Sequence, residues 1–154
     1  MSVKVYRCPS KISKNNSRSY AVSSMMNGLT DYQTSSSELG RRRSLIVKKI
    51  TGVKRPSERL AMICQGGVPS TNYGTECYGP SVDRRAWIDV PPAVHMGRTG
   101  TSLSFADGHA EYWKWKRAKD FADPHFNGQT DAIADDDEDF DKIQRAVWGK
   151  VVRR

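Results

Sequence analysis

Residues 101–116, TSLSFADGHAEYWKWK, decide the fold of this chain. They predict two β-strands joined at Asp107-Gly108, a pair that is among the strongest short-range signals for a hairpin. Both residues tolerate the positive φ that a tight two-residue turn requires. The stretch therefore predicts an antiparallel hairpin.

The two faces of this predicted hairpin differ in polarity. If Asp107 and Gly108 are the whole loop, alternation along each strand separates an apolar set from a polar one. The apolar, core-facing set is Leu103, Phe105, Ala110 and Tyr112, and the opposite set is Ser102, Ser104, His109 and Glu111, followed by Trp113 and Trp115. A slip of one residue in register would exchange the two sets. The length of the turn therefore determines which side chains face the core, and the hydrophobic pattern in turn favours one turn length.

The composition predicts one soluble domain with long loops. The 154 residues fit a single domain, with the sheet and its loops over residues 1–128 and an acidic segment and helix over residues 129–154. Hydrophobic residues make up only 37% of the chain, which predicts long polar loops. No apolar run approaches the ~20 residues of a membrane-spanning helix, and no signal peptide is visible.

The remaining segments predict short strands, long loops and one helix. Strand-like segments are residues 3–7, 19–26, 45–53, 60–64 and 86–90, with a corner at 56–58 and loops at 66–85 and 117–134. Residues 135–150 predict a helix, because Phe140, Ile143 and Val147 share one face. Acidic residues in its first turn and Gly149 at its end suit the two termini. The fold class is therefore α+β, a small antiparallel sheet with long loops and a C-terminal helix.

A net charge of +8 suits an anionic partner such as nucleic acid, a membrane surface or an acidic protein. The basic residues are scattered along the chain, which favours a solvated basic surface instead. Residues 113–117, WKWKR, interleave aromatic and basic side chains as nucleic-acid surfaces do. Strand alternation, however, puts both tryptophans on one face and both lysines on the other. A nucleic-acid-binding domain is therefore the alternative and not the favoured function.

The chain has three cysteines: Cys8, Cys64 and Cys77. No pair has the short spacing of a structural zinc site. One disulfide with a leftover thiol and three reduced thiols both remain open.

A family resemblance rests on His95 followed, after eleven residues, by Asp107-Gly108 within HMGRTGTSLSFADGHAEYWKW. This stretch resembles the C-terminal signature of bacterial prepilin-type processing-associated proteins, which look like type II secretion pseudopilins. The signature residues here are His95, Phe105, Asp107, Gly108 and His109. Shorter stretches, Cys8-Pro9-Ser10, residues 19–22 and residues 55–58, are similar to the family as well. The spacer after His95 is longer than is usual in the family.

The resemblance implies a pilin-head-like domain with a non-catalytic structural role in a type II secretion or type IV pilus-like system. It implies other pilin or pseudopilin subunits, or secretion-system proteins, as partners. It also implies a place in the cell envelope, on the periplasmic side of the inner membrane, or in an extracellular filament. The family's N-terminal membrane helix does not precede Cys8 in this sequence, so the chain looks like the globular head alone. An engineered truncation, a mis-set start and a natural soluble derivative all remain open, and membrane contact is expected only through the missing helix. The core face of the hairpin then needs another cover, such as residues 138–148 or a second copy of the chain.

Two candidate sites carry alternative chemistry. His95, Asp107 and His109 have the donor types of a metal or acid–base cluster. A structural role in and around the turn is the favoured interpretation, and no nucleophile or phosphate-binding motif accompanies them. We therefore expect no enzymatic activity, with a His/Asp-dependent enzyme as the least favoured function.

The second candidate is a calcium site in the acidic segment, formed by Asp131, Asp135, Asp136, Asp137 and Asp139, with Asp141 nearby. The spacing is not that of an EF-hand loop, because the glycine at its sixth position is missing. Related pseudopilins hold calcium near the C-terminus, so the resemblance gives this site a basis. A solvated helix start is favoured, and we expect no cofactor, with calcium as the alternative.

Overall fold

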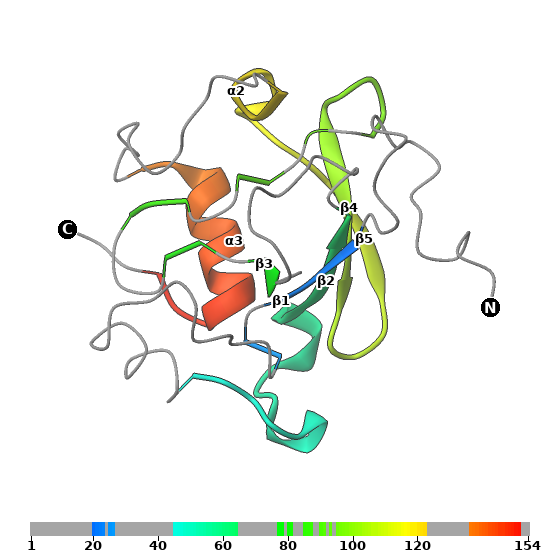
Figure 1. The fold of residues 1–154 in the computed structure, drawn as a ribbon, viewed down its shortest axis with the longest axis vertical. Helices are drawn as coiled ribbons and strands as arrows, with labels where there is room; N and C mark the ends of the chain where they lie inside the picture. Colours follow the sequence, from blue (N-terminus) through cyan, green and yellow to red (C-terminus); the bar gives the residue numbers. More distant parts are fainter. Residues whose placement is uncertain are drawn as a thin grey trace.

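The computed structural model of the chain describes residues 20–23, 25–26, 45–64, 77–78, 80–81, 85–87, 90–91, 93, 95–122 and 136–151. These residues form a five-stranded sheet with a long helix, α3, packed across one face (Figure 1). The strand order is β3-β1-β2-β4-β5. Four of the strands are antiparallel neighbours, and the short β3 pairs with β1 in parallel. The predicted α+β class is confirmed.

The elements are short, and most of them lie where the sequence predicts. The strands are β1 (Tyr20–Ser23), β2 (Leu60–Cys64), β3 (Cys77–Tyr78), β4 (Gly100–Phe105) and β5 (Ala110–Lys114). The helices are α2 (Ala118–Ala122), α3 (Glu138–Trp148) and two 3-10 turns, η3 (Ile50–Gly52) and η4 (Pro56–Glu58). No helix within the described residues is long and apolar enough to cross a membrane.

The hairpin of β4 and β5 is present, but its predicted register is wrong by one residue. Leu103 lies opposite Glu111, and Ser104 lies opposite Ala110. The loop therefore has three residues, 106–108, instead of two. Gly108 takes the positive φ, at 95°, as in the three-residue hairpin loops that end in a left-handed residue.

The slip exchanges the two faces of β5, as expected for a strand in which side chains alternate. Trp113 points into the core and is only 6% exposed, whereas Tyr112 points outward and is 38% exposed. The prediction is thus right for Leu103 and Phe105, which are buried, and wrong for Ala110 and Tyr112, which are exposed. The physical reason is that burying the larger indole removes more apolar surface from water.

Helix α3 confirms the predicted C-terminal helix and its ends. The Asp137 carboxylate accepts a hydrogen bond from the Phe140 N–H at 2.9 Å and so caps the first turn. Gly149 ends the helix with φ 74°, and its N–H donates to the Arg145 carbonyl at 2.7 Å.

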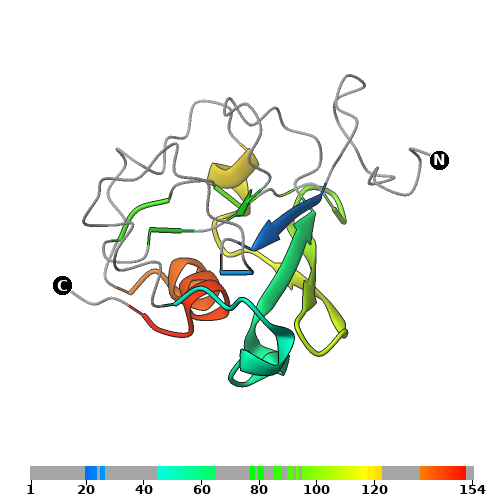
Figure 2. The same ribbon diagram turned by 60° about the horizontal axis from the view of Figure 1, so that its bottom comes forward.

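The buried face of α3 covers the core face of the sheet (Figure 2). Phe140, Ile143 and Val147 belong to the same hydrophobic cluster as Leu103 and Phe105. Residues of α3 therefore supply the cover that the hairpin needs, which was one of the two alternatives expected. Two further cluster members, Trp87 and Phe121, extend this core beyond the end of the sheet.

Two predicted segments differ from the structure. Residues 45–53, predicted as a strand, form turns and the 3-10 turn η3 instead. The Val47 N–H donates to the Met25 carbonyl at 2.9 Å, and among the described residues no other backbone hydrogen bond ties this segment to a neighbouring one. β-branched content favours a strand only where a partner strand lies alongside. The predicted loop at 117–134 contains α2, which follows β5 after residues 115–117.

The remaining predicted segments fit in part. The strand expected over 19–26 is present as β1, and that over 60–64 as β2. The loop predicted at 66–85 contains β3. Of the strand predicted at 86–90, Trp87 forms an isolated bridge with Pro80, and residues 88–89 lie outside the described residues. The strand predicted at 3–7 lies outside the described residues, as does Cys8.

Candidate functional site

A chain of polar side chains runs along β5 from the hairpin turn toward α3. The His109 Nδ1 lies 2.5 Å from an Asp107 carboxylate oxygen, and its Nε2 lies 3.3 Å from a Glu111 oxygen. Glu111 in turn accepts a hydrogen bond from the Trp113 indole N–H at 2.5 Å. His109, Glu111 and Trp113 are neighbours because alternate residues of a strand share a face.

Phe105 stacks on the imidazole of His109, the histidine in this row of polar side chains, and holds that ring in place. The two rings are parallel, with centroids 4.4 Å apart. The His109 backbone N–H also donates to the Asp107 carboxylate at 3.2 Å. Four of the five signature residues, Phe105, Asp107, Gly108 and His109, are therefore joined in one turn.

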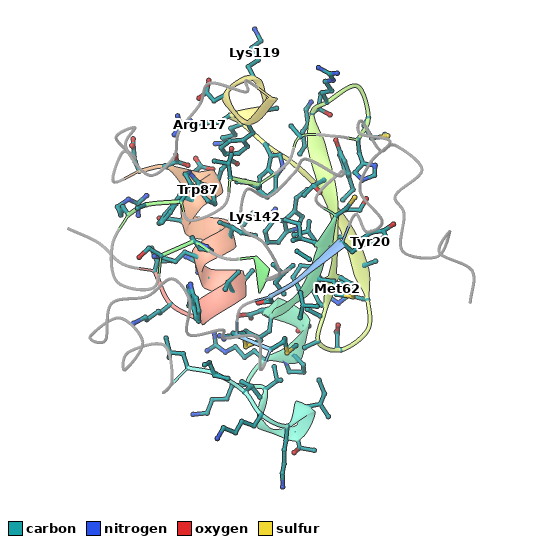
Figure 3. All side chains as sticks on the ribbon, viewed as in Figure 1. Tyr20, Met62, Trp87, Arg117, Lys119 and Lys142 are labelled. Atoms are coloured by element: carbon teal, nitrogen blue, oxygen red, sulfur yellow. The ribbon has the colours of Figure 1, made fainter. Side chains whose placement is uncertain are left out.

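The hydrogen bonds shift the pKa values of His109, Asp107 and Glu111 toward their charged forms. The bond to Asp107 raises the pKa of His109, and the same bond lowers the pKa of the Asp107 carboxyl. The Trp113 N–H is the main cause of the lowered pKa of Glu111. At the far end, the Lys142 Nζ lies 3.9 Å from the centroid of the Trp113 ring, and partial burial lowers the pKa of Lys142 (Figure 3).

The His109 ring contacts Asp107, Glu111 and Phe105, and within the described part of the chain no hydroxyl or thiol is hydrogen-bonded to it. A histidine between two carboxylates lacks the nucleophile that a catalytic triad would need. The arrangement is suited to holding a turn.

His95 does not join the other signature residues. It forms an isolated bridge with Gly100, the first residue of β4 and the end of that strand away from the turn. The backbone between them is tightly wound, because Met96, Gly97 and Arg98 have φ of 48°, 73° and 66°. The structure thus separates His95 from Asp107 and His109 by the length of a strand, and the three-residue cluster does not form.

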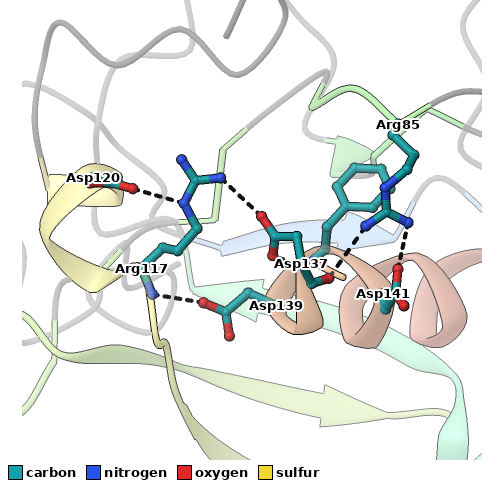
Figure 4. A network of polar contacts seen from close by, with 7 residues as sticks. Arg85, Arg117, Asp120, Asp137, Asp139 and Asp141 are labelled. Atoms are coloured by element: carbon teal, nitrogen blue, oxygen red, sulfur yellow. Dashed lines mark hydrogen bonds and ion pairs between the residues drawn. The ribbon is translucent and has the colours of Figure 1, made fainter. Parts of the chain in front are cut away.

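The acidic segment is bound to arginines (Figure 4). Arg117 donates to the carboxylates of Asp137 at 2.9 Å and Asp120 at 2.7 Å, and its backbone N–H donates to Asp139 at 2.8 Å. Burial raises the pKa of Asp139. Arg85 donates to the Asp141 carboxylate at 2.6 Å and to the Asp137 carbonyl at 3.5 Å.

These contacts occupy carboxylates that were candidates for calcium. Among the described residues, no three histidine, cysteine, aspartate or glutamate side chains are grouped as a metal site requires. Asp136 is exposed, and Asp131 and Asp135 lie outside the described residues. A calcium site stays a prediction. The acidic residues are predictable from the sequence but their partners Arg85 and Arg117 are not, because a partner in another segment leaves no local spacing signal.

The structure also reveals a basic cleft that the sequence interpretation missed. Residues 45–59 and the C-terminal end of α3 enclose a cleft of about 780 Å³. Its cationic lining residues are Lys48, Lys49, Lys54, Arg55, Arg59 and Arg145. The sequence signal for this cleft is the run KKITGVKR at 48–55, which overlaps the strand predicted at 45–53.

Comparison of the chain with protein-family models, curated proteins and solved structures found no match.

Proposed function

We propose that this chain is a non-catalytic interaction domain, similar to the head of a pseudopilin, that docks to other subunits of a secretion or pilus-like assembly. The observation that carries the proposal is the turn at 106–108. The signature residues Phe105, Asp107 and His109 contact one another there, on an exposed hairpin. Residues that build a rigid turn instead of a reactive site suit a docking role.

The rest of the fold supports the same role. The helix α3 and the sheet form one core, so the hairpin stands on a rigid scaffold. Binding surfaces are commonly built from loops held on such scaffolds. The place of the domain would be the cell envelope or an extracellular filament.

Two features argue against the alternatives. Trp113 and Trp115 are buried, so they cannot stack on bases as aromatic side chains of nucleic-acid-binding proteins do. His95 lies away from His109, which leaves a His/Asp-dependent enzyme without its third group.

The test uses the gene and its full product. We expect the coding DNA upstream of Met1 to encode, in frame, a basic leader and an apolar segment of ~20 residues, the length that spans a membrane. Coexpression of the full product with a prepilin peptidase should shorten it by the leader, as measured by mass spectrometry. An upstream stop codon without such a segment, or a full product that the peptidase leaves intact, would count against the proposal.

A further inference from the structure

The basic cleft has two walls from distant parts of the chain. One wall is the segment 45–59, and the other is the last turn of α3 with Arg145, Trp148 and Gly149. Figure 2 shows this segment passing beside the C-terminal end of α3. Arg59 joins the walls, since its guanidinium donates to the Val147 carbonyl at 3.1 Å. Gly149 makes room for it, because a Cβ there would lie on the Arg59 Nη1.

The lining of the cleft is strongly cationic. Six basic side chains face a single carboxylate, Glu58, which lies 3.5 Å from Arg55 in an exposed pair. Five positive charges therefore remain uncompensated by the lining residues. In Figure 3, nitrogen-tipped side chains spread outward from this end of the molecule. The Nε of Arg59 is buried and has no hydrogen-bond partner among the described residues.

An aliphatic side chain stands beside these charges. Ile50 is 64% exposed, the second-largest exposure among the large hydrophobic residues of the described chain. It opens the turn η3, which is held by the Gly52 N–H donating to the Lys49 carbonyl at 2.9 Å. Lys48 and Lys49 directly precede Ile50, and Lys54 and Arg55 follow its turn. The turn therefore presents one exposed apolar side chain between two pairs of basic residues in the sequence, all four of which line the cleft.

This combination selects among anionic partners. A nucleic-acid backbone would use the cations but would gain nothing from an exposed aliphatic side chain. A membrane with anionic headgroups uses both, because lysine and arginine bind the surface charge while apolar side chains enter the boundary of the acyl region. We propose that the cleft and Ile50 form a docking surface for an anionic phospholipid membrane.

The experiment measures sedimentation of the protein with vesicles. We expect binding to phosphatidylcholine vesicles that contain a third of phosphatidylglycerol, no binding to phosphatidylcholine alone, and loss of binding at high salt. The variant Lys48→Ala/Lys49→Ala should bind about 30-fold more weakly, from the usual contribution of each lysine near an anionic surface. Its matched control is Lys114→Ala/Lys119→Ala, which removes the same charge from exposed positions away from the cleft and should bind as the parent does.

The variant Ile50→Ser separates a membrane from other polyanions. It keeps every charge, so it should weaken vesicle binding severalfold and leave any binding to a short DNA duplex unchanged. Equal binding to both kinds of vesicle, equal losses in the cleft and control variants, or an unchanged Ile50→Ser would each overturn the proposal. So would DNA binding tighter than vesicle binding at the same salt. Circular dichroism of each variant verifies that the fold is kept.

Discussion

The rings of Phe105 and His109 lie parallel, with an angle of 1° between their planes. These two residues end β4 and follow the turn, and the Phe105 N–H donates to the His109 carbonyl at 2.9 Å. Because they face each other, the loop between them has three residues. The two rings can therefore stack only in this register, in which Trp113 points into the core and Tyr112 points toward solvent.

The first prediction concerns Gly108, whose φ of 95° is unfavourable for any other residue. No atom lies within 4 Å of a Cβ added there, so the cost of Gly108→Ala comes from the backbone alone. We expect the free energy of unfolding to fall by about 1–2 kcal/mol, as measured by urea denaturation. The control Gly52→Ala adds a Cβ at ordinary contact distance, 3.4 Å from Val47, and should change stability by less than about 0.5 kcal/mol.

The second prediction tests the register through the two faces of β5. Trp113→Ala removes a buried indole and should cost about 3–5 kcal/mol of unfolding free energy. Tyr112→Ala removes an exposed ring and one hydrogen-bonded hydroxyl, 2.7 Å from that of Thr99, and should cost about 1 kcal/mol. The register predicted from a two-residue loop gives the opposite order, so equal or reversed costs would contradict the structure.

The third prediction concerns the pH dependence of the turn. Since the folded state raises the pKa of His109, the protonated imidazole stabilises it. This contribution is complete below the ordinary histidine pKa of about 6.5 and is lost as the pH rises through the higher folded value. NMR titration should therefore place the His109 midpoint above the ordinary value.

Asp107→Asn should move that midpoint downward, because it removes the main cause of the shift. Glu111→Gln should move it less, since the Glu111 bond contributes less than the Asp107 bond. If the His109 midpoint is the same in Asp107→Asn as in the parent, this hydrogen bond does not raise the pKa of His109.

For the hairpin, the sequence predicts the strands and the position of the turn but not the register. Alternation identified Leu103 and Phe105 as core residues and placed the turn near Asp107-Gly108. The local signal did not distinguish a two-residue loop from a three-residue loop, because Gly108 supplies a positive φ in either. What decides is packing against α3, a contact between segments that no local pattern reports.

In the candidate sites too, features within one segment are predictable from the sequence, and contacts between distant segments are not. The acidic first turn of α3 and the stop at Gly149 were predictable, because both depend on residues close to one helix end. Arg85 and Arg117 come from other segments, and so does the second wall of the basic cleft. In the run KKITGVKR, the β-branched residues favour a strand, which the structure does not have. The four basic residues of the run are the feature that corresponds to the cleft.

The fourth prediction concerns the buried ion pair of Arg85 and Asp141. The Arg85 side chain is fully buried, and that of Asp141 is 13% exposed. Asp141→Ala would leave a buried guanidinium without this carboxylate, and we expect a loss of about 3 kcal/mol in chemical denaturation. The exposed pair of Arg55 and Glu58 is the matched control, and Glu58→Ala should cost less than about 1 kcal/mol. Similar losses at both pairs would show that burial does not decide their importance.

The fifth prediction separates the two roles of Asp137, which caps α3 and binds Arg117. Asparagine caps a helix about as well as aspartate but carries no charge. Asp137→Asn should therefore lose only the ion pair, whereas Asp137→Ala should lose the cap as well.

We expect the alanine variant to be less stable than the asparagine variant by about 1 kcal/mol. Thermal and urea unfolding of both variants measure this difference. High salt should narrow the gap between the parent and Asp137→Asn only slightly, because the Asp137 side chain is buried and little screened. If the two variants are equally stable, the cap contributes nothing and the arginine contact alone holds the start of α3.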